Sequence, residues 1–215
     1  DLKRIALKID GVEVQSDRLV EIDETLLVRQ VPDEFVLEVV TEINPEANTA
    51  LEGLYLSNGM FCTQCEAEGF RRITYYPDRP DVMSVFTTRI ISDASRPVLL
   101  SNGNPVSDQH LPDGRREVVW SDPFPKPCYL FALVGGDLAI KHDEFVTMSG
   151  RRIDLRIYVE PKDRDRVDYA LESLKRAMAW DESAYGREYD LDIVMDVSVS
   201  HFNMGAMAKK GLHLF

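Results

Sequence analysis

The sequence predicts a mainly β protein, in which a saddle-like sheet or sandwich is followed by a strand–helix–strand unit of α+β type. Short runs of alternating apolar and polar residues recur within residues 1–140, and this is the pattern of half-buried strands. Clusters of Gly, Pro, Asn and Asp separate the runs. Strong helical periodicity occurs in a single stretch, between Val167 and Met178.

The first strands are expected on either side of an Asp-Gly turn. Residues 5–9 alternate, residues 10–11 form a hairpin signal, and residues 12–14 continue the alternation. Three prolines in residues 123–127 predict an extended segment rather than the interior of a strand. Turns are predicted at 57–59, 101–104, 112–114 and 121–123, and further strands at 25–28, 35–40, 72–75, 86–91, 118–120 and 129–134.

The pattern changes after the Gly-Gly-Asp sequence at 135–137. A strand is predicted at 153–159, with Pro161 ending it, and a second strand at 191–199. Between them, Asp163 and Asp165 suit the start of the helix and Gly186 suits its end. A boundary within 137–143 therefore divides the chain into a β domain, residues 1–140, and the beginning of another domain, residues 141–215. If the strand–helix–strand layer of residues 141–215 is unfinished, one of its apolar faces would have no partner.

Composition and charge narrow the class of partner. The chain has 215 residues and a net charge of −12, which disfavours nucleic acid and anionic membranes as ligands. No apolar run approaches the roughly 20 residues that a membrane-spanning helix needs. Three cysteines without a disulfide framework favour a cytoplasmic location. A local acidic pocket that binds a cationic ligand is compatible with this net charge.

Metal and redox chemistry have weak support in the residues themselves. The four histidines lack the His-Glu-x-x-His spacing, and a metal shared by His201 and His213 would still need further ligands. Cys62 and Cys65 form a single CxxC pair followed by acidic residues, which favours two buried, reduced thiols over a redox pair. Redox work by this pair remains a hypothesis that needs a low thiol pKa.

Two further patterns suit the binding of a peptide. Glu66 and Glu68 would share one face of an extended segment and together attract a cation, although a solvated acidic edge is the commoner outcome. Residues 203–207 (NMGAM) combine thioethers with small residues, which allows a permissive pocket beside an exposed backbone edge. Taken alone, this second pattern fits core packing better.

Several longer blocks of the sequence carry a family resemblance: residues 49–55 (TALEGLY), 62–71 (CTQCEAEGFR), 75–81 (YYPDRPD), 100–104 (LSNGN), 122–132 (DPFPKPCYLFA) and 188–193 (EYDLDI). These blocks resemble the amino-terminal domain of the bacterial aminopeptidase N family, whose members are zinc-dependent alanyl aminopeptidases. The resemblance covers nearly the whole chain and implies that it spans the later part of the β domain and the opening of a thermolysin-like catalytic domain. The zinc-binding helix would then lie outside these residues, so no zinc is expected in this chain.

The resemblance also implies a substrate site. Gln64 and Glu66 are similar to a pair that lines the first substrate pocket, with Glu66 contacting the free α-amine. Met204 is similar to a methionine that cushions the substrate side chain. Gly205, Ala206 and Met207 are similar to the start of a Gly-Ala-Met-Glu-Asn motif that aligns the peptide.

The last two residues of that motif differ. Ala208 stands where the family has Glu, and Lys209 where it has Asn, so an anion is lost and a cation is added. The amine site is therefore expected to be impaired. We expect a substrate-positioning part of a zinc aminopeptidase that acts on peptides with a free N-terminus and that works with the remaining catalytic domain. The chain alone is expected to be inactive. The alternative is a catalytically dead β-rich module that binds proteins or serves as a scaffold.

Overall fold

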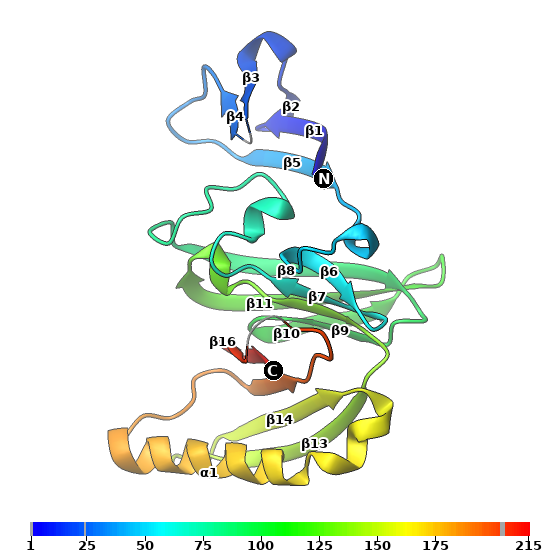
Figure 1. The fold of residues 1–215 in the computed structure, drawn as a ribbon. Coiled ribbons are helices and arrows are strands. Elements are labelled where there is room, and N and C mark those ends of the chain that lie inside the picture. Colours follow the sequence, from blue (N-terminus) through cyan, green and yellow to red (C-terminus); the bar gives the residue numbers. More distant parts are fainter. Residues whose placement is uncertain (1, 24, 203–204) are drawn as a thin grey trace.

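The computed structural model describes residues 2–23, 25–202 and 205–215, and the predicted mainly β fold is confirmed. Figure 1 shows three levels: a small β unit that contains the N-terminus, stacked sheets in the middle, and a sheet backed by one long helix at the opposite end. The described C-terminal residues include two strands of this last sheet, β16 and β17, and in the figure the C-terminus lies on the side of that sheet nearer the middle sheets. None of the described helices has the length and the hydropathy of a membrane-spanning segment.

The N-terminal unit contains a three-stranded sheet in the order β2-β1-β5 and a two-stranded sheet of β3 and β4. The predicted turn is present, because Asp10 and Gly11 both adopt positive φ and β1 pairs with β2 across them. Leu7, Ile9 and Val14 form a small core. The bounds are β1 (Lys3–Ile9), β2 (Val12–Glu13), η1 (Ser16–Arg18), β3 (Leu19–Ile22), β4 (Thr25–Val28) and β5 (Leu37–Glu42).

The middle of the molecule is a sandwich of two sheets, with strand orders β10-β11-β8 and β6-β7-β12-β9. Trp120 of β11 joins them, because it is buried in the main core and its Nε1 donates a hydrogen bond to the Leu99 carbonyl of β9 at 3.0 Å. The bounds are η2 (Pro45–Ala47), β6 (Gly53–Ser57), β7 (Met60–Gln64), η3 (Phe70–Arg72), β8 (Ser84–Asp93), β9 (Val98–Ser101), β10 (Asn104–His110), β11 (Arg115–Lys126), η4 (Cys128–Leu130) and β12 (Leu133–Gly136).

Two of the predicted strands need correction. Residues 72–75 are not a strand: Arg72 is the last residue of the 3-10 helix η3, and a turn and an irregular segment follow it. The run at 129–134 begins in the 3-10 helix η4, and β12 starts only at Leu133. In both places aromatic and apolar side chains pack around Phe70 and Phe131 rather than across a strand ladder. The two strand predictions were wrong because apolar content alone does not distinguish a strand from an irregular segment packed in a core.

The predicted turn at 121–123 is wrong, because these residues belong to β11, and the prediction for the proline-rich run at 123–127 is only partly right. Its first residues belong to β11, which continues to Lys126. The pairing of β11 with β8 nevertheless shifts register between Asp122 and Lys126. Proline has no N–H to donate to the ladder, so the strand continues while its pairing is interrupted.

The last sheet has the order β13-β14-β15-β17-β16, with parallel pairing of β14 with β15 and of β15 with β17. Gly186 ends the helix in the left-handed conformation, as predicted. Asp163 and Asp165 lie instead in the 3-10 helix before it. The bounds are β13 (Ala139–Val146), β14 (Arg152–Val159), η5 (Pro161–Arg166), α1 (Asp168–Tyr185), β15 (Ile193–Val197), β16 (Met207–Lys209) and β17 (Leu212–Leu214).

The expected bare apolar face is not found on β15. Ile193 and Met195 point into the main core, which they share with Tyr55 of β6, while Val194 on the opposite face packs in the cluster that includes Leu171 of α1. The central strand is thus covered by the sandwich on one side and by the helix on the other. The division of the chain near residue 140 stays a prediction, and the two parts share one core.

Candidate functional site

Gln64 and Glu66 lie where β7 gives way to a tight turn. Gln64 is the last residue of β7 and is buried, and its Nε2 donates a hydrogen bond to the Glu66 carbonyl at 2.9 Å. The turn closes with a hydrogen bond from the Gly69 N–H to the Cys65 carbonyl at 2.8 Å. The Glu66–Ala67 peptide is cis. The strand end therefore fixes the backbone from which the Glu66 side chain projects.

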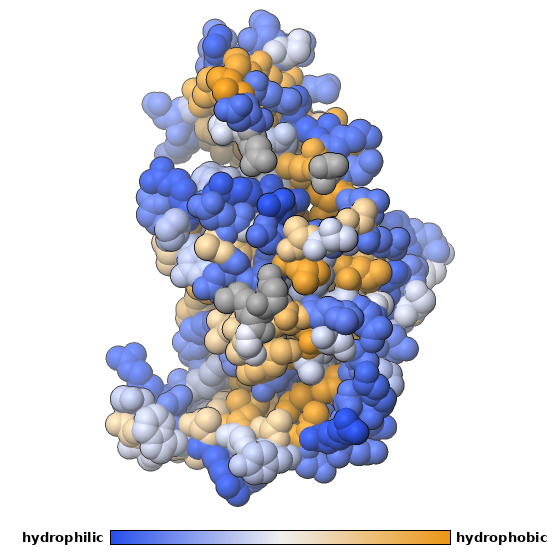
Figure 2. All heavy atoms as spheres, in the orientation of Figure 1, coloured by the Kyte–Doolittle hydropathy of each residue, from blue (hydrophilic) through white to orange (hydrophobic). Residues whose placement is uncertain are grey.

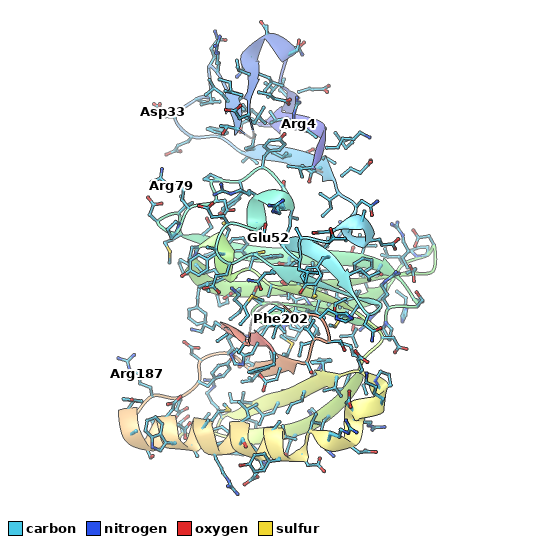
Figure 3. The ribbon with its side chains drawn as sticks, viewed as in Figure 1. Arg4, Asp33, Glu52, Arg79, Arg187 and Phe202 are labelled. Carbon is cyan, nitrogen blue, oxygen red and sulfur yellow. The ribbon has the colours of Figure 1, made fainter. Side chains whose placement is uncertain are left out.

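Glu66 lines a cavity of about 710 Å³ between the N-terminal unit and the sandwich. Its side chain is 44% exposed. Arg72 bonds Glu52 across the cavity wall at 2.6 Å, and Figure 3 shows Glu52 beside β6. Five carboxylates and two guanidinium groups line the cavity, so it has acidic character; these residues are Glu21, Asp23, Glu52, Glu66, Glu68, Arg71 and Arg72.

The expected pairing of Glu66 with Glu68 on one face is wrong. Residues 66–69 form a turn and not an extended segment, so side-chain alternation does not apply. The Glu68 carboxylate lies 3.5 Å from Arg71, whereas the Glu66 carboxylate lies 3.5 Å from Lys209. The two acids line the same cavity but face different cations.

Lys209 is the cation on the inner side of Glu66. Its side chain is fully buried, and its Nζ donates a hydrogen bond to the Tyr129 carbonyl at 2.6 Å and lies 5.6 Å from the centre of the Tyr129 ring. Burial lowers the pKa of Lys209, and the Glu66 carboxylate opposes that shift. The sequence placed a new cation near the site, but nothing in it pointed to the Tyr129 carbonyl as a partner.

The motif residues occupy the edge of the last sheet. Gly205 and Ala206 are exposed just before β16, which is an edge strand paired only with β17 among the described strands. Met207 is buried in the main core, so its side chain packs and only its backbone is available at the edge. Ala208 is exposed, opposite His213. Met204, expected to contact the substrate, lies outside the described residues.

The thiols of the CxxC pair do not fit the redox hypothesis. Cys62 and Cys65 are both fully buried and unpaired. Burial raises the pKa of Cys62 to about 11 and that of Cys65 to about 12. The third cysteine, Cys128, lies 2.9 Å from an Asp78 carboxylate oxygen, and burial raises its pKa to about 12. Redox thiols need the opposite shift.

A metal centre is not formed by the described part of the chain. No group of three or more His, Cys, Asp or Glu side chains comes together there. His201 donates its backbone N–H to Ser57 Oγ at 3.0 Å, and the His213 ring contacts Asp196 at 2.8 Å. The hypothesis of a metal shared by these two histidines therefore gains no support.

Comparisons with known proteins give one consistent result. The chain is 56% identical to aminopeptidase N of Caulobacter vibrioides over 214 residues and to aminopeptidase N of Escherichia coli over 216 residues. Each match covers 100% of this chain and 25% of the relative. The chain therefore spans about a quarter of the length of these relatives.

The fold agrees with the sequence match. The crystal structure of Legionella pneumophila aminopeptidase A in complex with aspartic acid superimposes with a TM-score of 0.94 at 36% identity, covering 100% of this chain and 25% of that one. The Peptidase M1 N-terminal domain family matches residues 3–130. The chain therefore belongs to the M1 peptidase family and corresponds to the N-terminal part of its aminopeptidases.

Proposed function

We propose that this chain is the amine-recognising part of a longer zinc aminopeptidase that removes N-terminal residues from peptides. The observation that carries the proposal is the position of Glu66. In a chain 56% identical to two aminopeptidases N over its whole length, this carboxylate stands half-exposed at the wall of a large acidic cavity. A carboxylate in a partly dry pocket is suited to a peptide's terminal ammonium.

Other residues would help to position the peptide. Gln64, buried at the end of β7, bonds the Glu66 carbonyl and so holds that residue in place. The exposed backbone at Gly205 and Ala206 leads into an edge strand, where an extended peptide can add main-chain hydrogen bonds. Met204 is proposed to contact the substrate side chain, and this proposal rests on the resemblance alone.

Hydrolysis belongs to parts outside the described residues. These residues do not form a metal site, so the zinc ion of the proposed enzyme, its ligands and the activated water would be supplied by the rest of a catalytic domain. We therefore propose that the 215-residue chain by itself has no peptidase activity. Zinc-dependent release of a fluorophore from an alanyl amide by the purified chain would contradict this. The proposed location is the cytoplasm, which the three unpaired cysteines support.

Amine recognition is tested by ligand titration. Two-dimensional NMR of the 215-residue chain would follow the binding of L-alaninamide, with N-acetyl-L-alaninamide as the uncharged control. We expect Glu66→Gln to weaken binding of the charged ligand selectively. Equal binding of both ligands, or binding unaffected by the substitution, would contradict the proposal.

A non-catalytic binding module is the competing function, and Ala208 is the observation that favours it. This exposed position carries a methyl group where the resembled motif carries a carboxylate. A module of that kind would keep its protein partner when Glu66 is changed to Ala. The aminopeptidase proposal requires the opposite, a loss of amine binding.

A further inference from the structure

Lys209 places an ammonium where the fold gives it few partners. Its side chain is fully buried although it comes from the edge strand β16. A buried ammonium is costly unless it is hydrogen-bonded and paired with an anion. Its one short hydrogen bond, 2.6 Å to the Tyr129 carbonyl, goes to an uncharged group. The Glu66 carboxylate at 3.5 Å supplies the compensating charge.

Glu66 faces two environments at once. Its carboxylate lies 3.5 Å from the buried Lys209 ammonium, its side chain is 44% exposed, and the residue is part of the lining of the acidic cavity. The two guanidinium groups of that cavity are engaged elsewhere, Arg71 with Glu68 and Asp78, and Arg72 with Glu52. Among the described side chains, Lys209 is the cation that forms an ion pair with Glu66.

We propose that Lys209 acts as a built-in competitor at the amine site: its ammonium neutralises Glu66 from inside and thereby weakens the binding of a primary ammonium from the cavity. This inference rests on the proposed function, since it concerns the same carboxylate. It assigns Lys209 a positioning and charge-compensating role, not a catalytic one. It also gives a physical form to the expectation that the altered motif impairs amine recognition.

The size of the effect follows from Coulomb's law. A ligand ammonium bound at Glu66 would lie several ångströms from Lys209 Nζ, at the boundary between interior and solvent. With an effective dielectric constant between those of protein surface and water, the repulsion corresponds to roughly a tenfold loss of affinity. Removing the charge of Lys209 should therefore tighten the binding of a primary ammonium by about tenfold.

Lys209→Met tests the idea, because Met keeps the apolar stem and removes the charge. The neighbouring Lys210→Met is the matched control: it makes the same change in the same hairpin, but Lys210 Nζ pairs with Asp190 at 2.7 Å. Four variants are titrated with L-alaninamide and n-butylammonium by NMR. They are Lys209→Met, Lys210→Met, Glu66→Gln and the double variant Glu66→Gln/Lys209→Met. Lys209→Gln serves as a second neutral variant if the Met form does not fold.

The outcomes separate the two proposals. Tighter binding by Lys209→Met, unchanged binding by Lys210→Met and loss of the gain in the double variant support the inference. If neither neutral variant at 209 binds more tightly while Glu66→Gln weakens binding, the inference is wrong and the proposed function stands. If Glu66→Gln leaves amine binding unchanged both in the wild-type chain and in the Lys209→Met chain, the amine site is misassigned and both proposals fail.

Discussion

Gly69→Ala should destabilise the turn that carries Glu66, and its cost can be worked out from the contacts around it. A Cβ at this position would lie 2.3 Å from the Gln64 carbonyl oxygen, where ordinary contact begins at 3.4 Å. The obstacle is backbone and cannot rotate away, so the turn must open by about 1.1 Å (3.4 minus 2.3). The φ of Gly69 is −84°, so the cost comes from crowding and not from backbone strain.

Two contributions set the magnitude. Overpacking of this kind costs about 1–3 kcal/mol. Opening the turn also weakens the hydrogen bond from the Gly69 N–H to the Cys65 carbonyl, for about 1 kcal/mol more. We expect the free energy of unfolding to fall by about 2–4 kcal/mol, which lowers the melting temperature of a chain this size by roughly 5–15 °C.

Urea unfolding followed by circular dichroism measures this loss. Gly205→Ala is the control, since a Cβ there meets nothing within 4 Å, and we expect it to change stability by less than about 0.5 kcal/mol. The reasoning is refuted if Gly69→Ala unfolds at the wild-type urea concentration, or if the Gly205 control loses as much stability.

Three further outcomes follow from two ion pairs and from the buried thiols. Lys126→Met removes the partner of the buried Asp122 carboxylate, 2.6 Å away, and should cost about 3–5 kcal/mol in a urea titration, with Asp122→Asn in the same chain recovering part of the loss. The hydrogen bond from Lys162, with two others, lowers the pKa of Glu160 to about 2, below its unfolded value. That stabilisation is therefore complete above about pH 5 and is lost as the pH falls toward 2, and Glu160→Gln should flatten the stability profile across this range. Both thiols of the CxxC pair should react with iodoacetamide at pH 8 far more slowly in the native chain than in urea, and fast native alkylation would revive the redox hypothesis.

Alternation identified some of the strands that have one solvent-exposed face, but not all of them, since β13 shows a similar alternation and was not predicted. Along β8 the side chains alternate between half-buried and exposed over all ten residues, so the run at 86–91 was visible in the sequence. β7 was missed because it is buried on both faces and carries Thr63 and Gln64 in the interior. Their polar side chains are hydrogen-bonded in the interior: Thr63 Oγ1 accepts the Leu133 N–H at 2.9 Å, and Gln64 Nε2 donates to the Glu66 carbonyl at 2.9 Å. Alternation cannot identify a strand of that kind.

The exposure of apolar side chains on the N-terminal unit could not be predicted from alternation either. Figure 2 shows apolar residues on the visible face of the N-terminal unit, beside blue, hydrophilic neighbours. The alternating pattern at 5–14 predicted the hairpin correctly, yet it implied burial for Ile5 and Val12, which are 51% and 70% exposed. A three-stranded sheet with a core of three buried residues has too little area to cover every apolar position.

The altered motif is best understood from the geometry of β16. Neighbouring side chains on a strand point to opposite faces, and here Met207 and Lys209 are buried while Ala208 between them is exposed. The two departures from the resembled motif therefore act on different sides of one strand. The change at 208 leaves a methyl group opposite His213, whose ring engages Asp196, and the change at 209 adds a charge behind Glu66. Because the sequence could not assign these faces, it indicated a single impaired site. The structure separates the missing carboxylate at the open edge from the internal cation behind Glu66, so we expect that restoring either position alone would leave the other change in place.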